Sequence, residues 1–171
     1  FRMDYYSEAP YPGKGASPRK NMELAYDVCL NYARKFESFL FRNLLMSGPP
    51  GLGKTFLSAC IARAVSEHGY SVVYDTAGNI FAQFEAKKFL RDSADGQDAR
   101  DETRRYLNCD LLIVDDLGSE LTTQFTQSVL YELVNTRLVA ERHTVISTNL
   151  SLEELARRHN AQIASRIEGE Y

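Results

Sequence analysis

The sequence predicts an α/β fold in which a mostly parallel sheet is covered by helices on both faces. Short apolar segments alternate with helical segments along the 171 residues. The apolar segments are hydrophobic throughout rather than at every second position, which is typical of strands buried on both faces. Motifs rich in glycine and acidic residues follow these strands, and ligands of such sheets bind at the carboxyl ends of the strands.

The first elements are recognised by their spacing and their end signals. Residues 1–17 are rich in Tyr, Pro and Gly without a period, and we expect an extended arm there. Proline directly after Ser17 is a helix-start signal, and apolar residues then recur every three or four positions, which predicts an amphipathic helix over 18–36. The apolar run NLLMS predicts a strand over 43–47, and the next helix closes at His68-Gly69.

The later elements repeat the strand–helix order. SVVYD predicts a strand over 71–75, before a helix at about 78–90. The polar segment 91–101 is expected to be mobile, and a short helix follows it. The remaining predicted elements are a strand over 110–115 (DLLIVD), a helix over about 122–140, a strand over 143–148 (HTVIST), a helix opened by the capping box Ser151–Glu154, and a short helical stretch that closes at 165–169.

Composition narrows the class of protein. The length suits one domain, and the net charge of −3 argues against a uniformly basic nucleic-acid binder. The longest strictly aliphatic run is 111–114, so no membrane-spanning segment is expected. Cys29, Cys60 and Cys109 match no metal motif. We interpret all three as reduced packing residues of a cytoplasmic protein.

A glycine-rich motif, GPPGLGKT at 48–55, lies between a predicted strand and a predicted helix. It matches G-x-x-x-x-G-K-[ST], in which backbone N–H groups and the helix N-terminus hold phosphate oxygens. Lys54 would place a positive charge at the β- and γ-phosphates, and Thr55 would offer its hydroxyl to Mg²⁺. The residues expected to bind the nucleotide are Gly48, Pro49, Pro50, Gly51, Leu52, Gly53, Lys54, Thr55 and Phe56.

Two acids end the apolar run LLIV. Asp115 is expected to hold the metal, and Asp116 to orient or deprotonate the attacking water. Asn149 ends the next strand and would reach the γ-phosphate or that water, although an asparagine there also commonly makes a turn. Arg166 is a candidate for stabilising charge at a neighbouring subunit's nucleotide. Arg137 is either a second intersubunit candidate or a surface helix residue.

Five motifs in order, GPPGLGKT, LLIVDDLGSE, VNTRL, ISTNLSLEEL and SRIEG, resemble the ATPase domain of DnaC-type helicase loaders and their IstB-type transposition relatives. These proteins belong to the AAA+ superfamily of P-loop ATPases. The resemblance covers about 18–171 and implies an ATPase that uses ATP and Mg²⁺ and assembles head-to-tail. It implies a sensor role for Asn149 and an arginine finger acting in trans for Arg166. We expect the last core strand and the lid of the superfamily to be missing from these residues, so that 18–171 is an ATPase domain truncated at its C-terminal end.

Four functions stay open. The first is a loader that assembles on single-stranded DNA and delivers the replicative helicase, with low turnover in the absence of its partner. The others are an IstB-type transposition helper, a P-loop small-molecule kinase and a nucleotide-gated binding module. A cluster of Phe84, Lys87, Lys88, Phe89 and Arg91 could contact single-stranded DNA. An amphipathic helix with a solvated basic face is the favoured interpretation of that cluster.

Overall fold

Parallel strands form a single sheet at the centre of the protein. The computed structural model describes residues 2–10, 15–90, 94–159 and 161–170. Within these residues the strands are β1 (Asn43–Ser47), β2 (Val72–Thr76), β3 (Leu111–Leu117) and β4 (His143–Thr148). All neighbouring pairs are parallel, and the strand order is β1-β4-β3-β2. The two strands that flank β4 in the sheet carry the glycine-rich motif and the acid pair at their carboxyl ends.

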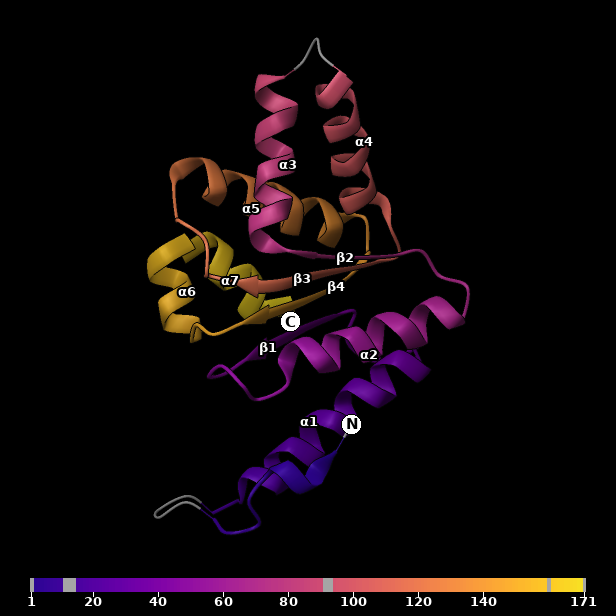
Figure 1. Cartoon of the computed structure of the whole chain (residues 1–171), viewed down its shortest axis with the longest axis vertical. Helices are drawn as coiled ribbons and strands as arrows, with labels where there is room; N and C mark the ends of the chain where they lie inside the picture. The colour runs from indigo at the N-terminus through magenta and orange to yellow at the C-terminus, as the bar shows by residue number, and fades with distance from the viewer. Residues whose placement is uncertain (1, 11–14, 91–93, 160, 171) are drawn as a thin grey trace.

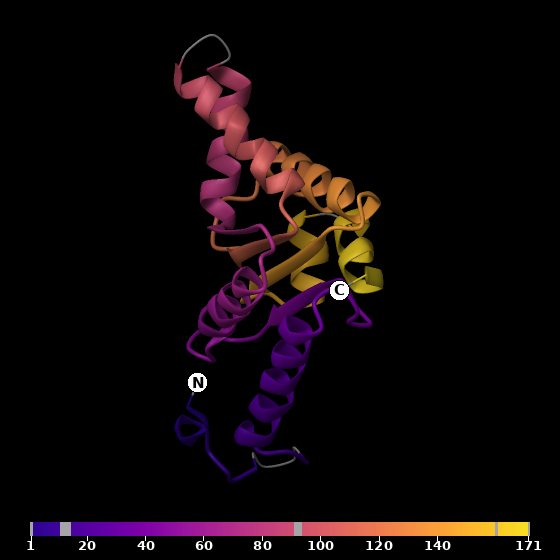
Figure 2. The same ribbon diagram turned by 90° about the vertical axis from the view of Figure 1, so that its right-hand side faces the viewer.

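Helices cover the sheet on both sides, as Figure 1 shows. Their bounds are α1 (Pro18–Arg34), α2 (Lys54–Glu67), α3 (Ala77–Phe89), α4 (Ala94–Asn108), α5 (Gln124–Val139), α6 (Leu152–His159) and α7 (Ala161–Glu170), with a short 3-10 helix at Met3–Tyr5. Helices α1 and α2 lie on one side of the sheet, and α3, α5 and α7 lie on the other. Helices α3 and α4 stand out from the rest as a packed pair (Figure 2).

Each face of the sheet is sealed by its own apolar cluster. Alternate residues of β3 enter opposite clusters: Leu111 and Ile113 face α1 and α2, whereas Leu112 and Val114 face α3, α5 and α7. All four of these side chains are at most 1% exposed. A strand buried on both faces has no polar side to show, which is why its sequence is apolar throughout. The predicted α/β fold is confirmed.

The residues predicted to cap helix starts form the expected capping hydrogen bonds. Ser17 accepts a hydrogen bond from the Lys20 amide at the start of α1. At α6 the Ser151 amide donates to Glu154 Oε2 over 2.8 Å, and the Glu154 amide donates to Ser151 Oγ over 3.2 Å. Two strands, β1 and β4, have the predicted bounds, whereas β2 begins one residue later and β3 extends through Leu117.

One expected mobile segment is helical. Helix α4 begins at Ala94, so most of the polar stretch 91–101 is ordered, and residues 91–93 lie outside the described residues. The buried stripe of α4 is Ala99, Thr103 and Tyr106, each about 1% exposed. These residues keep helical spacing, but one is small and one is polar, so hydrophobic periodicity does not show that the predicted short helix extends back to Ala94.

The cysteine expectation is wrong at one position. All three cysteines are free, and Cys29 and Cys109 are buried, but Cys60 is exposed. The buried face of α2 consists of Leu57, Ser58, Ile61 and Val65, and Cys60 lies outside it.

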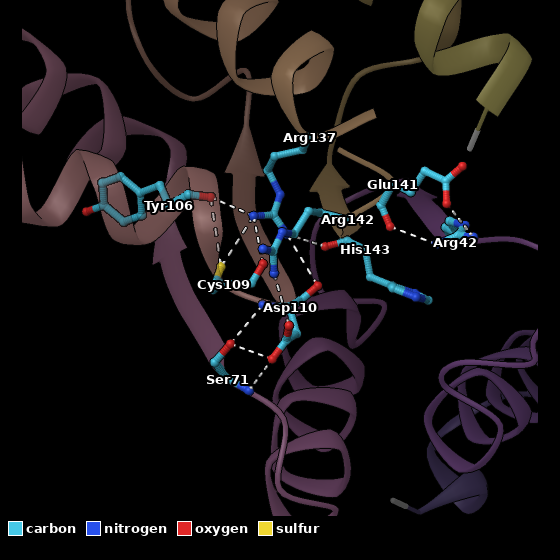
Figure 3. Close-up of polar contacts among 9 residues, drawn as sticks. All are labelled: Arg42, Ser71, Tyr106, Cys109, Asp110, Arg137, Glu141, Arg142 and His143. Atoms are coloured by element: carbon cyan, nitrogen blue, oxygen red, sulfur yellow. Dashed lines mark hydrogen bonds and ion pairs between the residues drawn. The ribbon is translucent and has the colours of Figure 1, made fainter. Parts of the chain in front are cut away.

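Arg137 is neither a surface residue nor an intersubunit residue, contrary to both predictions. Its side chain is 0% exposed and lies between α5, the end of α4 and the start of β4 (Figure 3). Its Nη1 donates to the carbonyl oxygens of Tyr106 (2.7 Å) and Cys109 (3.1 Å), and its Nη2 donates to that of His143 (2.6 Å). Carbonyl dipoles at a helix C-terminus favour a cation, so this guanidinium fastens α4 to the sheet.

The N-terminal segment packs back onto the protein. Tyr6 donates its hydroxyl to the Leu52 carbonyl over 2.9 Å, and Arg19 of α1 forms an ion pair with Glu8. The described part of the arm therefore contacts the glycine-rich motif. Among the described residues, no helix is both long enough and apolar enough to cross a membrane.

Candidate nucleotide site

The glycine-rich motif forms a tight loop between β1 and α2. Gly51 and Gly53 have φ of +80° and +88°, values that side-chain-bearing residues rarely adopt. Gly53 is the N-cap of α2, and Lys54 is the first residue of this helix. The N-terminus of α2, with its first backbone amides and the positive end of the helix dipole, therefore faces the loop, which is the usual arrangement for holding an anion.

Lys54 links the loop to the neighbouring strand. Its Nζ donates to the carbonyls of Gly48 (2.6 Å) and Pro49 (2.9 Å) and to Asn149 Oδ1 (2.6 Å). Asn149 follows β4, which lies beside β1 in the sheet. Partial burial lowers the pKa of Lys54, and the carboxylates of Asp116 and Asp115 oppose that shift. The ammonium is therefore held between the loop and the acid pair.

Asp115 receives hydrogen bonds from three directions. Thr55 Oγ1 donates to its Oδ1 over 3.3 Å, Ser147 Oγ donates to the same oxygen, and the Tyr74 hydroxyl donates to its Oδ2 over 2.7 Å. Asp115 is buried, with 6% of the residue exposed. Burial and the bond to Asp115 raise the pKa of the Tyr74 phenol, so that phenol stays a donor. This set of donors fixes the orientation of the carboxylate toward Thr55.

Asp116 adopts a left-handed backbone conformation, with φ of +56°. Its amide donates to Ser147 Oγ over 2.9 Å, and its carboxylate accepts from Asn149 Nδ2 over 3.1 Å. The ladder between β3 and β4 is irregular between Val114 and Leu117, next to this residue. A non-glycine residue in this conformation persists only where its surroundings hold it, and such residues cluster at functional sites.

The donor set fits a magnesium-bound triphosphate. The Thr55 hydroxyl and the Asp115 carboxylate are hard oxygen ligands 3.3 Å apart, beside backbone amides and a lysine ammonium. Within the described ranges, no group of three or more His, Cys, Asp or Glu residues is placed to hold a metal. Mg²⁺ commonly takes one or two protein ligands and completes its shell with phosphates and water, so two oxygen ligands suffice.

The structure brings together most of the predicted site residues. Lys54, Thr55, Asp115, Asp116 and Asn149 form one connected network. Phe56 lies one residue further along α2 and is 52% exposed. Arg166 is set apart from the network: its guanidinium lies over the Tyr131 ring, 5.2 Å from the centroid, and donates to the Tyr131 hydroxyl over 3.2 Å.

Two residues of the network were missed or undervalued by the sequence reasoning. Ser147 lies in the predicted strand 143–148 and was given no role of its own, yet its hydroxyl donates to the Asp115 carboxylate and accepts from the Asp116 amide. Tyr74 carried no signal, because only the register of β2 against β3 brings its hydroxyl to Asp115. The strand-end position of Ser147, next to the predicted acid pair, is the clue that was available.

A family model described as IstB-like ATP binding protein matches residues 19–165. The chain belongs to this family. Over 136 residues it is 26% identical to the replicative helicase loader DnaC of Escherichia coli K12, a match covering 80% of this chain and 54% of the relative. It is also 32% identical over 107 residues to a Sinorhizobium fredii protein named as an insertion sequence ATP-binding protein, covering 62% of this chain and 33% of the relative.

The fold agrees with that membership. A crystal structure of the DnaC helicase loader superposes with a TM-score of 0.71 at 22% identity, covering 99% of this chain and 92% of that one. The fold is that of a P-loop AAA+ domain, and the resemblance drawn from the five motifs is confirmed. The family match gives no support to the small-molecule kinase. The chain spans about half the length of the curated relatives it matches.

Proposed function

We propose that this chain binds Mg²⁺ and ATP and hydrolyses the bond between the β- and γ-phosphates, releasing ADP and inorganic phosphate. The observation that carries the proposal is the contact between loop and acids: Lys54 bonds to Asn149, and Asn149 bonds to Asp116. A triphosphate held by the loop amides would bring its γ-phosphate to this network. Bound Mg²⁺ would neutralise charge on the phosphates, with Thr55 and Asp115 as its protein ligands.

Each residue of the network has a role in this reaction. Lys54 balances charge on the β- and γ-phosphates. Asp116 accepts the proton of the attacking water or orients that water, and Asn149 holds the Asp116 carboxylate in place through its amide. The hydroxyl of Ser147 aligns the two acids with respect to each other. The two acids and Ser147 are already held together, whereas Lys54 must exchange one or more of its bonds to Gly48, Pro49 and Asn149 for a phosphate oxygen.

The binding half of the proposal is tested with Lys54→Ala. We expect loss of ATP affinity by at least about ten-fold in a titration calorimetry experiment, because the ammonium is a main counter-charge for the phosphates. Lys35→Ala is the matched control, since Lys35 is exposed at the end of α1. Equal ATP affinity of Lys54→Ala and wild type would contradict the nucleotide site.

The hydrolysis half is tested with Asp116→Asn. Asparagine tolerates φ of +56° at least as well as aspartate, so the loop is preserved while the basic oxygen is lost. We expect ATP affinity within about three-fold of wild type and a kcat at least about a hundred-fold lower. Full turnover by Asp116→Asn, measured as phosphate release, would remove this residue as the base.

We further propose that the ATPase serves a helicase loader acting on single-stranded DNA. The relative DnaC supports this role, and so does a groove of about 580 Å³ on the side of α3. Residues lining the groove include Lys87, Lys88, Arg100 and Phe125, and the Lys88 ammonium lies 5.2 Å from the Phe125 ring centroid. Phe84 is 4% exposed and so is not free to stack on a base, whereas Phe89 is 68% exposed. Arg91 lies outside the described residues.

Single-strand binding is tested by charge reversal at Lys87 and Lys88. We expect weaker binding of an oligonucleotide in the presence of ATP. The salt dependence of that binding should become shallower by about one unit for each DNA phosphate that the variant no longer neutralises. Lys20→Glu, at an exposed position on α1, is the control. An unchanged affinity across a salt titration would remove this groove from the DNA path.

Head-to-tail assembly is tested through Arg166. If this arginine acts on a neighbouring subunit's nucleotide, Arg166→Ala lowers hydrolysis while ATP affinity stays near that of wild type. Mixing Arg166→Ala with Lys54→Ala then restores part of the activity, because one subunit supplies the finger and the other an intact site. A monomer with full turnover would contradict this arrangement.

A transposition helper is the second candidate, and the 32% identity to the insertion sequence ATP-binding protein favours it. Both candidates use the same ATP site, so only the partner separates them. Affinity capture of the protein with ATP present, followed by mass spectrometry, decides the matter. A replicative helicase in the captured fraction supports the loader, and a transposase supports the helper.

A further inference from the structure

The backbone just after the acid pair is strained. Asp116 has φ of +56°, and Gly118 has φ of +99°. Gly118 also packs tightly, because a Cβ added to it would lie 2.4 Å from Cδ1 of Leu150. Two left-handed residues so close together need contacts that hold them in place. The direction of the Asp116 side chain depends on those contacts.

Both peptide groups of Gly118 are held by side chains. Arg158 of α6 donates from Nη1 to the Gly118 carbonyl over 2.8 Å, and the Gly118 amide donates to Glu120 Oε2 over 2.8 Å. The turn is therefore held by Glu120, which belongs to the same loop, and by Arg158, which belongs to α6. A carboxylate that accepts from a backbone amide makes a charge-assisted bond, which is stronger than a neutral one.

The second oxygen of Glu120 faces a buried imidazole. Glu120 Oε1 lies 3.6 Å from His159 Nε2, with side-chain exposures of 9% and 0%. At that distance the two atoms are close but not hydrogen-bonded. Within the part of the chain that the structure describes, neither ring nitrogen of His159 nor Oε1 of Glu120 has a hydrogen-bond partner. Buried polar atoms without a partner are rare in folded proteins and call for a reason beyond stability.

The charged groups around the imidazole are Glu120 and Arg158. Burial lowers the pKa of His159, the Glu120 carboxylate opposes this shift, and the Arg158 guanidinium adds to it. Arg158 is the same residue that holds the Gly118 carbonyl. The loop after Asp116 and the end of α6 thus meet through the Arg158–Gly118 hydrogen bond and through the buried contact between Glu120 and His159.

We propose that Glu120, set between the Gly118 amide and the His159 imidazole, is a positioning residue for Asp116. The inference rests on the hydrolysis proposed above. Glu120 holds the left-handed turn through Oε2, and the His159 imidazole lies 3.6 Å from its other oxygen. The turn in turn directs the Asp116 carboxylate toward Asn149 and Lys54. Glu120 itself touches neither of those side chains in the described network.

Kinetics of two Glu120 variants test the proposal. We expect Glu120→Ala to lower kcat for ATP by at least about ten-fold with KM within about two-fold, because misplacing the base affects hydrolysis rather than binding. Glu120→Gln keeps an acceptor for the Gly118 amide and should recover part of the loss. Glu153→Gln, at an exposed position on α6, is the control and should match wild type.

A second measurement follows the contact directly. In proton-detected histidine NMR, the His159 signal is assigned with His159→Gln among the three histidines of the chain. In Glu120→Gln the imidazole should titrate at a lower pH than in wild type, since the carboxylate that favours its charge is gone. Thermal unfolding of each variant shows how much protein is folded during the assay.

The outcomes separate the two proposals. The positioning role would be overturned, with the ATPase proposal left intact, if both Glu120 variants have the kcat of wild type. It would also be overturned if the loss of kcat merely follows the unfolded fraction, or if the His159 titration is unchanged. A wild-type protein that binds ATP but shows no turnover with its captured partner would overturn the proposed hydrolysis, and the positioning role with it.

Discussion

Replacing Arg137 with methionine should destabilise the protein severely. The substitution keeps most of the buried volume but removes every donor of the guanidinium. Three main-chain carbonyls, those of Tyr106, Cys109 and His143, accept from Arg137 over 2.6–3.1 Å in buried positions. A buried acceptor left without its partner costs about 1–3 kcal/mol. Release of the buried charge offsets part of that sum, so we expect a net loss of about 3–5 kcal/mol in the free energy of unfolding.

Urea unfolding at 25 °C, followed by circular dichroism, measures this loss. The midpoint should fall sharply with little change in slope, because the surface exposed on unfolding is nearly the same. Arg137→Lys keeps a charge and some donors, so its loss should be smaller. Arg63→Met is the control: Arg63 pairs with Glu67 but its side chain is 82% exposed, so the change should stay within about 0.5 kcal/mol. A loss below about 1 kcal/mol in Arg137→Met would refute the account of this junction.

Three further substitutions probe other features. Burial lowers the pKa of His143 to about 4, below its unfolded value of about 6.5, so the native state binds fewer protons and stability falls as pH drops through that window. His143→Phe should therefore flatten the fall of Tm between pH 7 and pH 4. Gly118→Ala should cost about 1–3 kcal/mol in chemical unfolding, because of its positive φ and the close leucine, whereas Gly78→Ala, with open space on α3, should be neutral or slightly stabilising. Ser147→Ala removes a donor to the proposed metal carboxylate and should raise the Mg²⁺ concentration for half-maximal turnover by about ten-fold.

Each of these three predictions has a result that would contradict it. An unchanged pH dependence of Tm in His143→Phe would mean that the imidazole does not titrate in the way its burial suggests. Equal stability of Gly118→Ala and Gly78→Ala would show that the turn after Asp116 is not strained. Wild-type Mg²⁺ dependence in Ser147→Ala would separate this hydroxyl from the metal.

Local signals made the sheet and the phosphate loop predictable. Glycines at 51 and 53 have the positive φ that their motif requires, and the Ser151–Glu154 capping box forms as its spacing indicates. The acids at 115 and 116 were placed correctly near the carboxyl end of a strand, although the strand continues past them to Leu117. Such features depend on residues that are neighbours in sequence.

Contacts between residues that are far apart in the sequence could not be predicted from local patterns. The carbonyls that surround Arg137 come from the end of α4 and the start of β4, so nothing near position 137 announces its burial. Glu120 and His159 are 39 positions apart in the numbering and meet only because α6 packs beside the loop after β3. The N-terminal half of helix α4, within 94–101, was missed for a different reason, since the buried stripe of the helix includes a threonine and an alanine. In each case tertiary packing, rather than local propensity, determines the result.

The projecting pair of helices has a mechanical consequence. Helix α4 has 15 residues and is therefore about 22 Å long at 1.5 Å per residue, with its foot fastened by Arg137. A rod clamped at one end acts as a lever, and a load at its tip becomes a torque at its base. That base adjoins the first residue of β3, whose opposite end carries Asp115 and Asp116. A force applied to the outer end of α4 would therefore be transmitted to the strand that carries the two acids.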